Sequence, residues 1–260
     1  MRRLPLIFLM TALSITFAKG QYIPYQPGEK VVYVIKYGFI TSGYSSLELK
    51  RDTFRGKELY HSIFTAQTVG IADAIFRIKD VYESYFNPEG EMPDFAIRNA
   101  VEGRYKRYNT NIFDRTSRKD SAVIISNLTG RHITEKEIRD VVSLVYYFRS
   151  NWLAKGYQFR KGEIVTIVTW FTDEYYPIRL VYAGQEEIKA KGGKILCYKF
   201  NPVTEVGRIF KTNDDVSVWF SADKNFLPVK LRFDIFVGAF TAELQSWEEL
   251  KAPLEINYTN

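Results

Sequence analysis

The sequence has only one cysteine and two histidines among its 260 residues, and it contains none of the common catalytic motifs. Because Cys197 has no partner, no internal disulfide forms, and a hydrophobic core must stabilise the fold alone. We interpret Cys197 as a small buried residue of a strand. His61 and His132 lack a second histidine or a cysteine at the spacing of metal sites. Glycine-flanked serine turns, His-Glu-x-x-His helices and phosphate-binding loops are absent. We therefore assign no catalytic residue, no metal site and no cofactor.

Long hydrophobic runs are also missing, apart from one at the start of the sequence. Arg2 and Arg3 precede a mostly apolar stretch over residues 4–17, and small residues at 18 and 20 stand before Gln21. This pattern is typical of a secretory signal peptide that is cleaved after residue 20. The apolar stretch is shorter than the about 20 residues that span a membrane, and a retained N-terminal anchor is the alternative.

The expected exported protein comprises residues 21–260, which we interpret as a single β-dominated domain. The residue directly after the predicted cleavage site is Gln21 and not a cysteine, so a lipid anchor at that position is excluded. We therefore expect a periplasmic or secreted protein that has no transmembrane segment in its mature form.

The excess of positive charge is small. The formal net charge of +6 falls to about +3 when Arg2, Arg3 and Lys19 leave with the signal peptide. The remaining basic residues are scattered, with one local cluster over residues 98–118. A charge this low predicts no nucleic-acid partner.

Aromatic residues are abundant, with 18 Tyr, 19 Phe and 4 Trp, and such residues favour strands. Apolar and polar residues alternate in short segments between glycine and proline, which indicates an antiparallel sheet. The predicted strands cover residues 31–37, 45–50, 59–68, 80–86, 95–101, 104–113, 122–126, 164–171, 178–183, 195–200, 216–220, 229–237 and 240–247.

Several predicted strands carry apolar residues on both faces, among them the strands of Trp170 and Phe233. One interpretation is ordinary burial between a sheet and a helix. The other is a strongly curved antiparallel sheet, half-barrel or sandwich-like, whose concave face lines an apolar cavity. Either way the fold class is mainly β.

The segment from Thr134 to Leu153 departs from the strand pattern, because its apolar residues recur at intervals of three and four. Thr134 and Glu137 predict a capping box at its start, and Gly156 lies just past its end. The sequence therefore predicts one long amphipathic helix packed on the sheet. A short helix or turn is predicted over residues 71–76.

Polar residues lie beside the apolar stripe of the predicted long helix. Asp140, Ser143 and Tyr147 stand three and four residues apart, and Arg149 follows them. They form either a patch that contacts a ligand or a set of hydrogen bonds to neighbouring strands and loops. The candidate ligand-binding residues are Asp140, Ser143, Tyr147, Arg149, Trp170 and Phe233.

Pairs of acidic residues at 173–174, 214–215 and 248–249 allow the alternative of a glycan hydrolase. Adjacent residues of a strand point to opposite faces, so solvated loops explain these pairs more simply. The triplet Asp120-Ser121-Ala122 matches a short bacterial O-glycosylation motif, although matches of three residues often arise by chance.

Four segments together resemble a known family. They are residues 28–38 with Gly43, residues 80–85, residues 140–149 with Gly156, and residues 221–231. The sequence resembles, over residues 22–250, the bacterial envelope family called domain of unknown function 3108. The resemblance implies an exported, mostly β protein with no established activity, and it implies no catalytic residues.

Compartment and aromatic content favour a non-enzymatic protein that binds or carries an apolar or amphiphilic envelope ligand, such as a lipid. One alternative is an envelope scaffold or assembly factor that binds another protein through a sheet edge or an aromatic patch. The other is the glycan hydrolase, which requires two carboxylates that face each other across a cleft.

Overall fold

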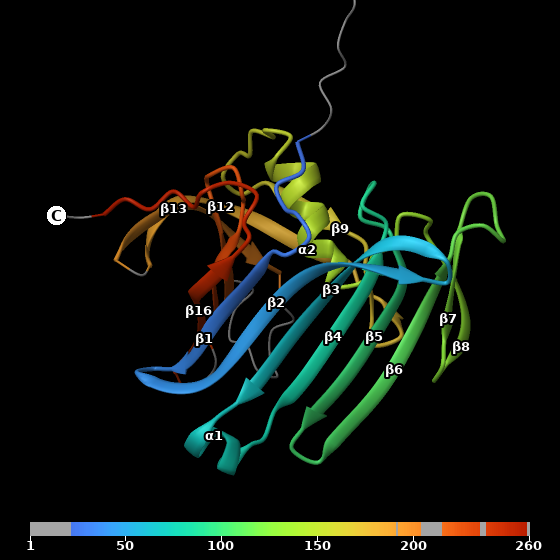
Figure 1. Cartoon of the computed structure of the whole chain (residues 1–260), viewed down its shortest axis with the longest axis horizontal. Helices are drawn as coiled ribbons and strands as arrows, with labels where there is room; N and C mark the ends of the chain where they lie inside the picture. The colour runs from blue at the N-terminus through green and yellow to red at the C-terminus, as the bar shows by residue number, and fades with distance from the viewer. Residues whose placement is uncertain (1–21, 191, 204–214, 235–237, 259–260) are drawn as a thin grey trace, which may run out of the picture.

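The computed structural model describes residues 22–190, 192–203, 215–234 and 238–258, and most of them form one antiparallel sheet (Figure 1). Within these residues the sheet has 14 strands in the order β8-β7-β6-β5-β4-β3-β2-β1-β16-β15-β14-β13-β12-β9. One half is a meander of consecutive strands: β1 (Lys30–Tyr37), β2 (Ile40–Phe54), β3 (Lys57–Thr68), β4 (Lys79–Phe86), β5 (Pro93–Glu102), β6 (Tyr105–Asp114), β7 (Ala122–Ser126) and β8 (Gly130–Thr134). The other half comprises β9 (Ile164–Ile167), β12 (Ile178–Ala190), β13 (Gly193–Pro202), β14 (Val216–Ser221), β15 (Pro228–Asp234) and β16 (Ala239–Glu248).

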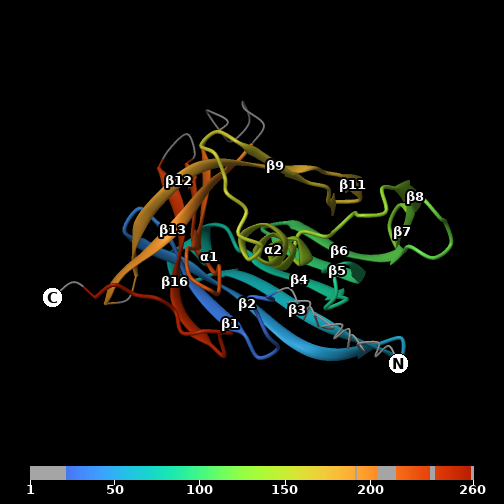
Figure 2. The same cartoon turned by 90° about the horizontal axis from the view of Figure 1, so that it is seen from above.

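Strand β1 joins the two halves, because Val31 pairs with Leu47 of β2 on one side and with Trp247 of β16 on the other. The sheet curves around a short helical segment, as Figure 2 shows. This segment consists of α2 (Ser143–Phe148) and one π-helical stretch, η1 (Arg149–Leu153). A separate hairpin of β10 (Trp170–Phe171) and β11 (Glu174–Tyr175) precedes β12. Helix α1 (Gly70–Ile75) connects β3 to β4, where a short helix or turn was expected.

The mainly β, antiparallel class predicted from residue alternation is confirmed, while individual strands differ from the prediction. The predicted strand over residues 164–171 ends at Ile167, because the next residues pair with a different segment. The Arg139 N–H donates to the Val168 carbonyl at 3.2 Å, and the Trp170 N–H donates to the Arg139 carbonyl at 2.7 Å. Strand β8 was not predicted. Residues 235–237 of another predicted strand lie outside the described residues.

The prediction of one long helix over residues 134–153 is wrong, because α2 and η1 together span only 11 residues. Thr134 belongs to β8 and pairs with Ala122 of β7, so it begins no capping box. Ile138 is buried in a cluster with sheet residues, which explains its apolar character without a helix. The predicted end is confirmed: Gly156 has a φ of 71°, and its N–H donates to the Leu153 carbonyl at 3.0 Å.

The helical segment packs against both halves of the sheet. On one side Tyr146 lies against Phe86 of β4, with ring centroids 5.2 Å apart. On the other side Phe148 contacts Phe200 of β13 edge to face, with centroids 5.0 Å apart. Side chains of the segment therefore fill the space that the curved sheet encloses at this level.

Cys197 is buried in β13, as its interpretation as a small core residue requires. Burial raises the pKa of its thiol to about 12, so the group stays protonated at neutral pH. Among the described residues, no helix is long and apolar enough to cross a membrane.

Candidate functional site

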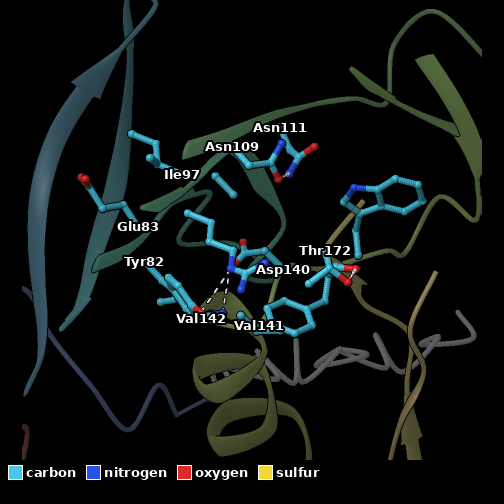
Figure 3. Close-up of a pocket in the computed structure, with 13 residues that line it drawn as sticks. Tyr82, Glu83, Ile97, Asn109, Asn111, Asp140, Val141, Val142 and Thr172 are labelled. Atoms are coloured by element: carbon cyan, nitrogen blue, oxygen red, sulfur yellow. Dashed lines mark hydrogen bonds between the residues drawn. The ribbon is translucent and has the colours of Figure 1, made fainter. Parts of the chain in front are cut away.

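A small polar pocket lies between the sheet and the segment that leads into α2 (Figure 3). Strands β4, β5 and β6 form one wall, and residues 140–142 with the β10–β11 hairpin form the other. The space that water-sized groups can occupy is about 30 Å³, inside a crevice of about 350 Å³ that includes open solvent at the mouth. We call this site the Arg98 pocket, after the cationic side chain in its lining.

Strand register brings the polar side chains of the first wall together. Arg98 of β5 pairs with Tyr82 of β4 on one side and with Asn109 of β6 on the other. Asn111 pairs with Ala96, two residues before Arg98, so these side chains share one face of the sheet. That face of the sheet is directed toward α2. Polar side chains buried there need hydrogen-bond partners to offset the cost of their desolvation.

Aromatic rings surround the Arg98 guanidinium. Its Cζ lies 5.6 Å from the ring centroid of Tyr82, 6.0 Å from that of Tyr105 and 5.3 Å from that of Phe171. The Nε–H donates to the Tyr82 hydroxyl at 3.2 Å, and Nη2 is 3.9 Å from the Glu102 carboxylate. Burial raises the pKa of Tyr82, which keeps the hydroxyl neutral. The planar cation is therefore held in one orientation.

Three buried polar atoms of the pocket have no hydrogen-bond partner among the described residues: Arg98 Nη1, Asn111 Oδ1 and Trp170 Nε1. Asn111 is 8% exposed and Trp170 is 6% exposed. The Asn111 amide is fixed, because its Nδ2 donates to Asn109 Oδ1 at 3.0 Å. Buried polar groups are almost always paired, and three of the eight unpartnered side-chain atoms among the described residues belong to residues that line this one pocket.

The β10–β11 hairpin carries backbone strain at the rim of the pocket. Its turn residues Thr172 and Asp173 have φ values of 53° and 65°, a conformation that disfavours β-branched threonine in particular. An ion pair of 2.8 Å between Arg107 of β6 and Asp173 holds the turn against the sheet. This contact keeps the neighbouring Phe171 ring over Arg98.

Asp140 lines the same pocket and also fixes the start of α2. Its Oδ1 accepts from the N–H groups of Val142 at 2.7 Å and Ser143 at 3.0 Å. Its Oδ2 accepts from the hydroxyls of Ser84 at 2.5 Å and Ser143 at 2.9 Å. Burial nevertheless raises the pKa of Asp140, because desolvation outweighs these hydrogen bonds.

The other lining carboxylate belongs to Glu83, which points away from the pocket in Figure 3. It contacts His61 Nε2 on the outer face at 2.7 Å. The described residues contain no group of three or more potential ligands for a metal ion.

Arg149 lies away from the pocket, in a fully buried network. Its Nη1 and Nη2 donate to the two carboxylate oxygens of Glu29 at 2.5 and 2.8 Å. Nη2 also donates to the Pro24 carbonyl at 3.0 Å, and Nε donates to the Asn225 carbonyl at 3.1 Å. Arg149 thus ties the helical segment to the N-terminal segment and to the β14–β15 turn.

The remaining predicted residues are also dispersed. Tyr147 stacks under Arg139, whose Cζ lies 3.4 Å from the ring centroid. Phe233 lies in β15 between Val216 of β14 and Phe240 of β16. Of the six candidates, Asp140 and Trp170 therefore line the Arg98 pocket, and Ser143 is the hydrogen-bond partner of Asp140.

Sequence reasoning missed Arg98, Asn109 and Asn111. Arg98 was counted only as part of a basic cluster, and the two asparagines were not noted. The available signal was alternation itself, because these residues occupy positions that face the core.

Fold and pocket define a mainly β protein in which a curved antiparallel sheet carries a small polar site. The protein belongs to the family described as protein of unknown function DUF3108, whose model matches residues 32–245. No curated protein matches the sequence. A similar solved structure is the beta-barrel-like protein of domain of unknown function DUF1849 from Brucella abortus, with a TM-score of 0.56 and 6% identity. That likeness covers 86% of this chain and 98% of the other, and it concerns the fold alone.

Proposed function

We propose that the protein is an exported, non-catalytic binding protein of the cell envelope, and that it holds the polar, anionic end of an amphiphile in the Arg98 pocket. Three residues that line one pocket each have a buried polar atom without a hydrogen-bond partner, and this observation carries the proposal. Leaving such a group unsatisfied costs about 1–3 kcal/mol, so a ligand that pairs all three gains affinity from each.

The donor and acceptor set favours a particular ligand chemistry. Arg98 Nη1 and Trp170 Nε1 are donors that suit a phosphate or a carboxylate, and the aromatic frame orients the guanidinium for it. Asn111 Oδ1 is an acceptor that suits a hydroxyl on the neighbouring atom of the ligand. A glycerophosphate-like group combines both features.

The apolar part of such an amphiphile lies outside the pocket in this proposal. The innermost space of about 30 Å³ suits a water-sized group, so the phosphate would occupy the crevice of about 350 Å³ that includes the open mouth. The neighbouring interior is occupied by Tyr146, Phe148 and their sheet partners. We therefore no longer place the apolar part of the ligand inside the concave face. The proposal is that the protein binds only the polar end of the amphiphile.

Replacing Arg98 tests the proposed site directly. We expect Arg98→Gln to weaken binding of lysophosphatidylglycerol, measured by isothermal titration below its critical micelle concentration, about 10- to 100-fold. Arg98→Lys should recover only part of the affinity, because lysine lacks the planar fork. Arg131→Gln, an exposed position of β8, is the matched control. Equal binding by the Arg98→Gln variant, or none by the wild type, would reject the proposed site.

The proposed compartment depends on residues 1–20, which lie outside the described residues. We expect the protein expressed with its own N-terminus in a bacterium to be recovered from the periplasm and to begin at Gln21. Intact mass and N-terminal sequencing of the purified protein measure this. Recovery of the uncleaved chain in the cytoplasm or in the membrane fraction would contradict export by a cleaved signal peptide.

A further inference from the structure

Large apolar side chains are exposed together at one end of the sheet. In Figure 1 the β1–β2 turn, helix α1 and the β5–β6 turn all lie at the lower end of the molecule. The exposed apolar residues of this end are Phe39, Ile40, Ile71, Ile75 and Phe76. We call it the docking end.

Phe39 occupies the tip of a two-residue turn between β1 and β2. Gly38 takes the position with a φ of 57°, which leaves Phe39 projecting into solvent at 104% relative exposure. The residue at this turn position has no packing role, and polar residues are usual in such turns. Packing within the protein therefore does not explain a fully exposed phenylalanine at this position.

Helix α1 repeats this feature beside the turn. None of its residues is buried, and Ile71 and Ile75 are 75% and 79% exposed. The Val69 N–H donates to the Ser42 carbonyl at 3.0 Å, which holds the start of α1 next to β2. The Phe76 ring lies against Gly103, so α1 also contacts the β5–β6 turn.

Basic side chains accompany the apolar ones. Arg77, Lys79, Arg104 and Lys106 are all exposed at this end. The acidic neighbours are engaged: Asp73 lies 4.0 Å from Arg77, Glu102 lies 3.9 Å from Arg98, and Asp80 accepts from the Val101 N–H at 3.0 Å. Among the described residues, Lys79, Arg104 and Lys106 form no ion pair, so this end carries an excess of positive charge.

We infer that the docking end binds the surface of an anionic lipid bilayer. Apolar side chains projecting from separate turns can enter the boundary between headgroups and acyl chains, and the lysines and arginines around them attract anionic headgroups. A protein partner is less well matched, because lysine is depleted at protein–protein interfaces. This inference stands apart from the proposed function, since it needs no ligand in the Arg98 pocket.

The two sites are nevertheless close along the sheet. The Arg98 guanidinium lies 6.0 Å from the ring of Tyr105, the first residue of β6 after the β5–β6 turn.

Vesicle co-sedimentation of the purified protein tests the inference. The probes are vesicles of phosphatidylcholine alone and vesicles with equal parts of phosphatidylglycerol, at low and high salt. We expect binding to the anionic vesicles that weakens with salt. Phe39→Ser with Ile75→Ser should lower the partition coefficient at least about tenfold. Each of Lys79→Gln, Arg104→Gln and Lys106→Gln should lower it about fivefold.

Ile133→Ser on the edge strand β8 is the matched control, because Ile133 is 65% exposed but lies outside the docking end. Circular dichroism confirms that every variant is folded, which is expected for exposed positions. The inference is overturned if the wild type does not bind anionic vesicles, or if the docking-end variants bind as the control does. Loss of self-association or of a co-purifying protein in the same variants, without vesicle binding, would assign the surface to a protein partner instead.

Discussion

Arg149→Met is expected to lower the free energy of unfolding by about 3–5 kcal/mol, the largest effect of any single substitution proposed for this protein. The variant leaves the Glu29 carboxylate, which is 1% exposed, without its cationic partner. It also removes the guanidinium N–H groups that donate hydrogen bonds to the Pro24 and Asn225 carbonyls. Guanidinium denaturation followed by circular dichroism and tryptophan fluorescence measures the change. For a domain of this size the melting temperature should fall by about 10 °C.

The double variant Arg149→Met with Glu29→Gln separates the ion pair from the packing of the long side chain. It should recover part of the lost stability, because no unpaired charge then remains buried. Arg232→Met is the matched control, since Arg232 pairs with Asp234 on the surface, where both side chains are more than 40% exposed. That substitution should change stability by less than about 1 kcal/mol. Equal losses at Arg149 and Arg232 would show that the buried network contributes little.

The strands were predictable because their main determinant is local. In a half-buried antiparallel sheet, alternate residues face the core, and Val31 with Tyr33 or Leu47 with Leu49 shows this in the sequence itself. The connections were less predictable. Strand β9 ends where the chain meets Arg139, a residue far away in sequence, so a local pattern carried no sign of the break.

The helix shows how apolar spacing can mislead. Ile138 fits the stripe of a helix, but it packs into a sheet cluster between a turn at residues 136–137 and the bridge of Arg139 with Thr169, ahead of α2. Short helices gain most of their stability from tertiary packing, so period alone does not set their length. The better signal was the spacing of Asp140 and Ser143, because an aspartate that accepts from the N–H groups two and three residues later is a frequent start for a helix.

The Arg98 pocket depends on strand register, which the sequence specifies only through the whole sheet. Arg98 meets Asn109 because the β5–β6 turn at Gly103 sets the pairing of the two strands. Trp170 reaches the same place from a hairpin more than 60 residues later. The sequence was enough to choose Asp140 and Trp170 as candidate ligand-binding residues. It did not show that both residues line the same pocket.

Asp140→Ala is expected to lower the free energy of unfolding by about 3–4 kcal/mol. The substitution removes the acceptor at the start of α2 and leaves the buried Ser84 hydroxyl without its partner. The Ser143 hydroxyl loses the carboxylate and keeps only the Asp140 carbonyl at 3.3 Å. Asp140→Asn should cost much less, because an amide oxygen can accept from the two N–H groups while its NH₂ donates to rotated hydroxyls. Thermal and guanidinium unfolding of the three proteins at pH 7 measures the difference, with Asp120→Ala in an exposed turn as the control.

The pH dependence of the Asp140→Asn variant provides a second, independent readout. Burial raises the folded-state pKa of Asp140 above the value of 3.8 in the unfolded chain, so its ionised form opposes folding at pH 7. As the pH falls through the raised pKa toward 3.8, the folded protein takes up the proton first, and this opposition is lost. The stability of the wild type relative to Asp140→Asn should therefore rise as the solution is acidified through that window. A constant or falling difference would mean that the hydrogen bonds to the carboxylate outweigh its desolvation.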